Sequence, residues 1–129
     1  MRKFTNILLV EDDPITVMVC DRIIKMTAFA ENVSSCNNGK AALEYLVALG
    51  EQDKDIPEII FLDINMPVMN GWDFLAEFEK VQHNMKQLPR IYILSSTVDP
   101  EDYKRAKSFP LVQDFISKPL SKESLQNIS

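Results

Sequence analysis

The chain has 129 residues, of which 46% are hydrophobic, and this favours one domain with a real core over a disordered protein. The net charge of −5 argues against a dedicated nucleic-acid binder, which would need a basic face. No apolar stretch approaches the roughly 18 residues that span a membrane, and the N-terminus has no signal peptide pattern. Two cysteines, Cys20 and Cys36, do not make a disulfide framework, so we expect reduced thiols in a cytoplasmic protein.

The first half of the chain alternates between strand and helix patterns. Strands are predicted at 6–10, 31–36 and 58–62, and helices at 14–27 and 38–50. Asp13 can cap the first helix and Pro14 suits its first position. The expected inward face of that helix is Ile15, Met18, Val19, Ile23 and Met26. The expected inward face of the second helix, which should end at Gly50, is Ala42, Leu46 and Leu49.

The second half continues the same alternation. Strands are predicted at 90–94 and 112–116, and helices at 71–83, 99–107 and 121–128. The helix at 71–83 carries Trp72, Leu75, Ala76 and Phe78. Strands that alternate with helices indicate an α/β sandwich with a parallel sheet and right-handed crossovers.

Polar residues follow four of the apolar runs. They are Glu11-Asp12-Asp13, Asp63, Ser95-Ser96 and Lys118. The strand ends of an open parallel sheet line one crevice, so these groups should converge there. Carboxylates suit Mg²⁺, and a carboxylate such as Asp63 can attack phosphorus to give an acyl phosphate. Ser95 and Lys118 can then contact the phosphoryl oxygens.

Each of these residues also has an ordinary interpretation. Asp13 is mainly a helix cap, Asp63 could be a turn residue, and Ser95 could be a solvated hydroxyl. Lys118 could be a surface lysine, and the single histidine, His83, is best explained as a solvated surface residue. The four features together, at the same end of four strands, favour a phosphorylation site.

Four motifs carry a resemblance to a known family. They are Ile7-Leu8-Leu9-Val10-Glu11-Asp12-Asp13-Pro14, the stretch from Asp63 to Gly71 with Met66-Pro67 inside it, Ile93-Leu94-Ser95-Ser96, and Phe115-Ile116-Ser117-Lys118-Pro119-Leu120. With these motifs the chain resembles the response regulator receiver domain of two-component systems, in its single-domain, chemotaxis-regulator-like form. The resemblance covers essentially the whole chain, and the stretch from Asp63 to Gly71 is its most specific part.

The resemblance implies the chemistry of the site. Asp63 would be the phosphoacceptor, and Asp12, Glu11 and Asp63 would hold Mg²⁺ together with the backbone carbonyl of Asn65. Asp13 would stand outside this set, in keeping with a role as the helix cap.

The resemblance also implies a switch. Ser95 matches the switch hydroxyl and Lys118 the family's lysine, which Pro119 would follow through a cis peptide bond. Phe115 stands at the aromatic switch position, and because Phe has no hydroxyl, switching there would depend on packing alone. Thr97 lies where the family tunes the lifetime of the phosphorylated state.

The implied fold is flavodoxin-like, a doubly wound five-stranded parallel sheet of order 2-1-3-4-5 with helices on both faces. The implied donor is a histidine kinase or a phosphotransfer protein. The implied target is a protein that binds the face of the fourth helix, fifth strand and fifth helix, with no direct contact to nucleic acid and no membrane insertion. The expectation is one receiver domain over residues 1–129 without an output domain, either complete or cut from a longer protein.

Two other functions stay open. An aspartyl-phosphate phosphohydrolase usually needs an acid two residues after its nucleophile, where this chain has Asn65. A receiver-like scaffold that works without phosphorylation usually loses the acceptor, an acid or the lysine, and this chain has all of them.

Overall fold

The computed structural model describes residues 4–96, 99–118 and 120–128, so the predictions for Thr97 and Pro119 lie outside the described residues. The strands are β1 (Phe4–Val10), β2 (Ala30–Cys36), β3 (Ile59–Asp63), β4 (Arg90–Ser95) and β5 (Val112–Ser117). The helices are α1 (Pro14–Met26), α2 (Gly39–Glu51), α3 (Gly71–Val81), α4 (Pro100–Ala106) and α5 (Lys122–Gln126), and a 3₁₀ turn, η1 (Gln82–Asn84), follows α3. Within these ranges no helix has the length and the apolar character that a membrane span requires.

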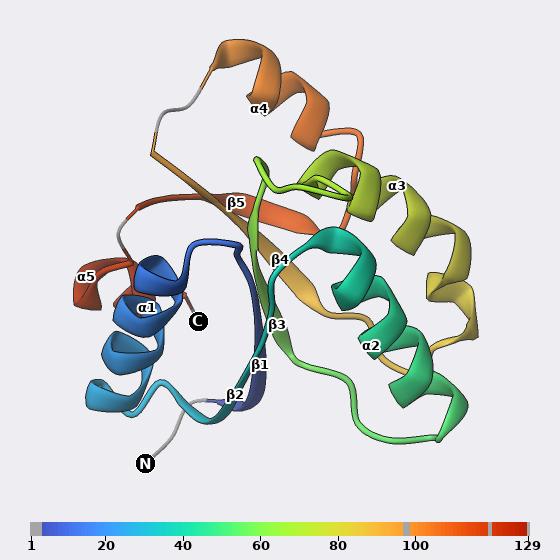
Figure 1. Cartoon of the computed structure of the whole chain (residues 1–129), viewed down its shortest axis with the longest axis horizontal. Helices are drawn as coiled ribbons and strands as arrows, with labels where there is room; N and C mark the ends of the chain where they lie inside the picture. The colour runs from blue at the N-terminus through green and yellow to red at the C-terminus, as the bar shows by residue number, and fades with distance from the viewer. Residues whose placement is uncertain (1–3, 97–98, 119, 129) are drawn as a thin grey trace.

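The five strands form one parallel sheet of order β2-β1-β3-β4-β5, which confirms the predicted fold class (Figure 1). β3 is central and all five of its residues are buried, as its unbroken apolar run predicts. β2 lies at an edge, as the expected strand order has it, and is largely polar and partly exposed. The order brings the C-terminal ends of β1 and β3 side by side, with Val10 paired to Leu62.

Each face of the sheet has its own core. On one face α1 and α5 pack over Ile7, Leu9, Phe61 and Ile116, which is the side where the blue and red helices meet in Figure 1. On the other face α2, α3 and the end of α4 cover Leu8, Val10, Leu62 and Ile93. Alternate residues of β1 therefore serve opposite cores, as side chains in a strand must.

The predicted inward face of α1 is wrong for four of its five residues, and only Ile23 of these packs against the core. The helix packs through Cys20 and Ile24, which are fully buried, with Val17 and Ile23 half-buried. Ile15, Met18, Val19 and Met26 are exposed. α1 is apolar on two sides, so helical spacing alone could not indicate which side meets the sheet.

One smaller prediction is also corrected. Gly50 does not end α2, because the helix continues through Glu51 and the left-handed φ of 57° is taken by Asp53. Of the four residues named for the helix at 71–83, Trp72, Leu75 and Phe78 are buried and Ala76 is exposed. Alanine is small, so at the border of the apolar face it can be either buried or exposed.

Candidate functional site

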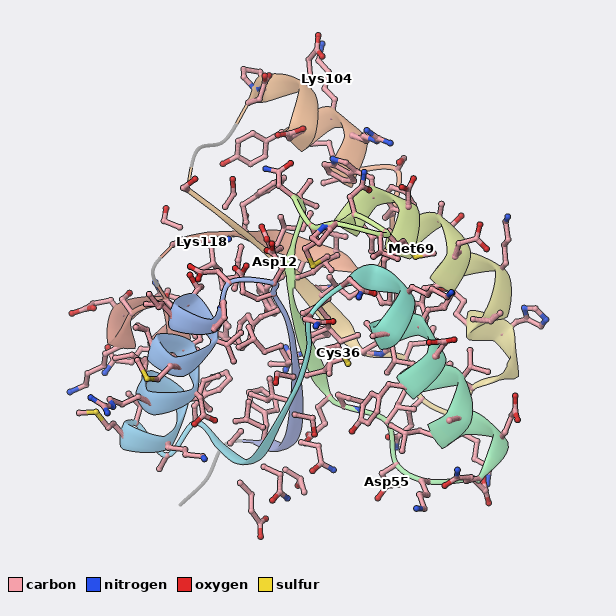
Figure 2. All side chains as sticks on the ribbon, viewed as in Figure 1. Asp12, Cys36, Asp55, Met69, Lys104 and Lys118 are labelled. Carbon is pink, nitrogen blue, oxygen red and sulfur yellow. The ribbon has the colours of Figure 1, made fainter. Side chains whose placement is uncertain are left out.

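Three carboxylates meet where β1 and β3 end. Glu11 and Asp63 are buried, at 2% and 5% exposed, and Asp12 is exposed. One oxygen atom from each of the three lies within 4.8 Å of the others. Figure 2 shows Asp12 and Lys118 at the same end of the sheet, opposite the loop that carries Asp55. Acids this close together repel one another unless a cation lies among them.

Lys118 supplies a positive charge to this cluster. Its Nζ lies 2.6 Å from Glu11 Oε1 and 3.0 Å from Asp63 Oδ1. Lys118 nevertheless follows β5, an edge strand that pairs with neither β1 nor β3. A backbone hydrogen bond of 3.0 Å fixes its place, because the Lys118 N–H donates to the carbonyl of Ser95 at the end of β4. The pairing of β4 with β5 therefore aims the lysine at acids that belong to β1 and β3.

Burial and charge act on these groups in opposite senses. Burial raises the pKa of Glu11 to about 6, and Asp63 adds to the rise, while Lys118 and the N–H of Asp13 lower it. Burial would lower the pKa of Lys118, but its contacts with Glu11 and Asp63 outweigh this and leave the pKa above its ordinary value. Lys118 is therefore charged at neutral pH.

Asp13 has the capping role that the sequence predicts. Its carboxylate accepts hydrogen bonds from the N–H of Ile15 at 3.2 Å and the hydroxyl of Thr16 at 2.7 Å, at the start of α1. The bond from Thr16, with that from Ile15, lowers the pKa of Asp13. Its own N–H donates to Glu11 Oε2 at 3.2 Å, so the cap also holds the buried acid in place.

A tight loop connects Asp63 to α3. The N–H of Met69 donates to the carbonyl of Pro67 at 2.7 Å, and Val68 between them has a φ of 69°, which together make a γ-turn. The N–H of Gly71 then donates to the carbonyl of Ile64 at 2.9 Å. A left-handed φ is unfavourable for a β-branched residue, so the surrounding contacts must hold this turn in place.

The three acids, Lys118 and Asp13 line one open cleft of about 360 Å³, which has room for a phosphoryl group and a donor side chain. The structure brings every predicted site residue to it, namely Glu11, Asp12, Asp63, Asn65, Ser95, Phe115 and Lys118. Asp102 of α4 and Trp72 of α3 also line the cleft, although neither was predicted as a site residue. Nothing in the local sequence indicates that α4 reaches the cleft.

The donor set fits a hard divalent cation. Carboxylate oxygens are the ligands that Mg²⁺ prefers, and Glu11, Asp12 and Asp63 offer three of them at the right mutual distance. Asn65 follows in the adjacent loop and lines the same cleft. The cluster has no thiol or imidazole, which softer metals would favour.

Comparison with known proteins gives one consistent family. The family model for the response regulator receiver domain matches residues 7–128. The probable methanogenesis regulatory protein FilR2 of Methanothrix harundinacea is 31% identical over 120 residues, which are 93% of this chain and 76% of that protein. The chain spans 54% of the length of the next two curated relatives.

Solved structures agree with this. A two-component response regulator from Cytophaga hutchinsonii superposes with a TM-score of 0.88 and 36% identity, covering 98% of this chain and 94% of that one. The receiver domain of the histidine kinase CKI1 from Arabidopsis thaliana, solved as a complex with Mg²⁺, gives a TM-score of 0.80 at 24% identity, with 97% and 92% covered. The second likeness supports the fold alone.

Proposed function

Because this chain belongs to the response regulator receiver domain family, we propose that Asp63 accepts a phosphoryl group and that this changes which protein the domain binds. Receiver domains are signalling domains, and the only chemistry proposed for this one is its own phosphorylation and dephosphorylation. The observation that carries the proposal is the buried Asp63 carboxylate, paired at 3.0 Å with Lys118 beside two further acids. In this proposal residues 1–129 are one receiver domain that acts in the cytoplasm.

The transfer step follows from the positions of these groups. A carboxylate oxygen of Asp63 attacks the phosphorus of a phosphohistidine, the O–P bond forms, the N–P bond breaks, and the imidazole leaves with a proton from solvent. Lys118 stabilises the negative charge on the phosphoryl oxygens, and Ser95 donates a hydrogen bond to one of them. Glu11, Asp12, Asp63 and the Asn65 carbonyl would hold Mg²⁺. When bound, the ion offsets the repulsion between the acids and the incoming phosphoryl group.

We propose Ser95 and Phe115 as the switch. Both line the cleft, and the Phe115 ring is half-buried, with the Tyr103 ring of α4 at 4.7 Å. Movement of Ser95 toward the phosphoryl group would open space for Phe115 to turn inward, and this would break its contact with α4. The surface of α4, β5 and α5 would then change shape, so we propose it as the face for the downstream protein.

We propose that the phosphodonor protein docks on α1. Ile15 and Met18 are 68% and 57% exposed, and the helix begins directly after the acids of the site. Val68, which is 78% exposed, lies in the loop after Asp63. A donor that brings phosphohistidine to Asp63 must cover this part of the surface, and apolar side chains on a helix suit a partner helix.

The direct test is the intact mass of the protein after incubation with acetyl phosphate, with and without Mg²⁺. A gain of one phosphoryl group that needs Mg²⁺, and that is absent in Asp63→Asn, supports the proposal. Asp12→Asn is expected to raise the Mg²⁺ concentration for half-maximal phosphorylation by about 10-fold or more, since changes around a metal site usually cost this much. No gain in folded wild-type protein with Mg²⁺ would favour the scaffold function, and steady turnover of small phosphoesters would favour the hydrolase.

A further inference from the structure

Few side chains hold α4 on the domain. Ala106 is the one buried residue of this seven-residue helix, and α4 lies at the periphery of the fold in Figure 1. Two contacts with aromatic rings add to the burial of Ala106 in holding α4. The Tyr103 ring meets the Phe115 ring edge-on at 4.7 Å, and the guanidinium of Arg105 lies over the Trp72 ring at 4.8 Å. A helix with so little buried surface should move readily.

The ring that Arg105 contacts, that of Trp72, lines the cleft. Trp72 is only 6% exposed, lines the cleft, and stacks with Phe109 at 6.3 Å with an interplanar angle of 24°. It follows Gly71, whose N–H is fixed to the loop after Asp63. The ring that Arg105 covers therefore belongs to the rigid part of the site, while Arg105 itself belongs to the loosely held helix.

We propose that Arg105 is a latch, a positioning residue that holds α4 in its present place by resting on Trp72 and so opposes the switch. The inference depends on the proposed function for its regulatory meaning. If Phe115 turns inward, Tyr103 loses its ring partner, and Arg105 on Trp72 is the ring contact that still restrains the helix beside the buried Ala106. A contact made in only one of two states sets the balance between them, so the latch lowers the population of the switched state.

Lys104 is a matched control for Arg105. It is the preceding residue of α4, it is exposed, and Figure 2 shows it pointing away from the domain. Arg105→Ala and Lys104→Ala remove the same charge from the same helix. A difference between the two variants therefore reports the contact with Trp72 and not the loss of a positive charge near an anionic site.

The first measurement is amide hydrogen exchange of α4 in the unphosphorylated protein. Arg105→Ala should speed exchange over 102–109 by about 2- to 5-fold, the range expected for an exposed cation–π contact, and Lys104→Ala should not. In a Trp72→Leu background the substitution Arg105→Ala should have no further effect on exchange, because the ring is already gone. Equal exchange in Arg105→Ala and Lys104→Ala would overturn the latch.

The second measurement is the initial rate of mass gain with acetyl phosphate and Mg²⁺. Arg105→Ala should raise it by a similar factor over Lys104→Ala, because the switched state is no longer opposed. Faster exchange with an unchanged rate would overturn the link between the latch and the site. Failure of the proposed function has a different signature, which is the absence of any mass gain in the wild-type protein.

Discussion

Charge balance at the site depends on four side chains. By formal charge, the carboxylates of Glu11, Asp12 and Asp63 and the ammonium of Lys118 together leave two negative charges. That remainder equals the charge of one divalent cation, and it is too large for a monovalent ion to neutralise. Lys118 offsets part of the repulsion between the three acids, and a divalent cation would offset the rest.

Gly71 is the residue whose replacement should disturb the site most directly. A β-carbon there would lie 2.7 Å from the carbonyl oxygen of Asp63 and 2.9 Å from the Cα of Ile64, and neither backbone atom can move freely. We expect Gly71→Ala to lower the free energy of unfolding by about 2 kcal/mol, as overpacking does. It should also slow phosphorylation by acetyl phosphate, because Asp63 is displaced. Urea unfolding and intact mass measure the two effects.

Gly50 provides the opposite case in the same experiment. A β-carbon at this helical position would meet only the flexible Met85 side chain, at 3.8 Å and 3.9 Å. Gly50→Ala should raise the free energy of unfolding by about 0.5 kcal/mol through helix propensity and leave phosphorylation unchanged. If both alanine variants destabilise the protein equally, close backbone approach is not what makes Gly71 special.

At the scale of elements, the strand predictions were more accurate than the predicted helix faces. An unbroken apolar run such as 59–62 suits a strand buried on both sides, and parallel strand ends must meet, so the acid cluster was predictable. α1 differs, because it is apolar on two sides and only the packed fold selects Cys20 and Ile24. The approach of Asp102 to the cleft was equally unpredictable, since it depends on where α4 settles.

The exposed side of α1 has a proposed function that can be separated from stability. Ile15→Ser combined with Met18→Ser should change the free energy of unfolding by less than about 0.5 kcal/mol, because both side chains are already exposed. Transfer from a histidine kinase or phosphotransfer protein that phosphorylates the wild type should fall about 30-fold, the effect of losing an interface hot spot. Acetyl phosphate needs no docking surface, so its rate should not change.

A matched variant on another surface tests this assignment. Leu88 is an exposed apolar residue just before β4, at the opposite end of the sheet from the site. Leu88→Ser should leave transfer from the donor protein as fast as in the wild type. If the rate of transfer from the donor protein falls equally in both variants, α1 is not the docking surface. The same holds if the α1 variant also loses reactivity with acetyl phosphate.

At the scale of the whole molecule, each of the two cores supports a different part of the site. The core under α2 and α3 is rich in aromatic residues, with Phe74 and Phe78 stacked at 5.7 Å, and it supports the loop that follows Asp63. The core under α1 and α5 joins β1, β3 and β5, the strands from which the acids and the lysine emerge. This core contains Ile116 of β5 and so helps to keep Lys118 in register with Glu11 and Asp63, and the five-residue α5 is its shorter helix.

The last helix should be held by burial and not by its own propensity. Five residues are too few for a stable isolated helix, yet Leu125 and Ile128 are 1% and 3% exposed in the core that α1 and β5 share. Leu125→Ala should therefore lower the free energy of unfolding by about 3 kcal/mol, as a buried leucine does when it leaves a cavity, with urea unfolding as the measurement. Gln126→Ala, an exposed neighbour, should change it by less than about 0.5 kcal/mol. A similar small effect in both variants would mean that the core on this face closes without α5, and that β5 and Lys118 are positioned by strand pairing alone.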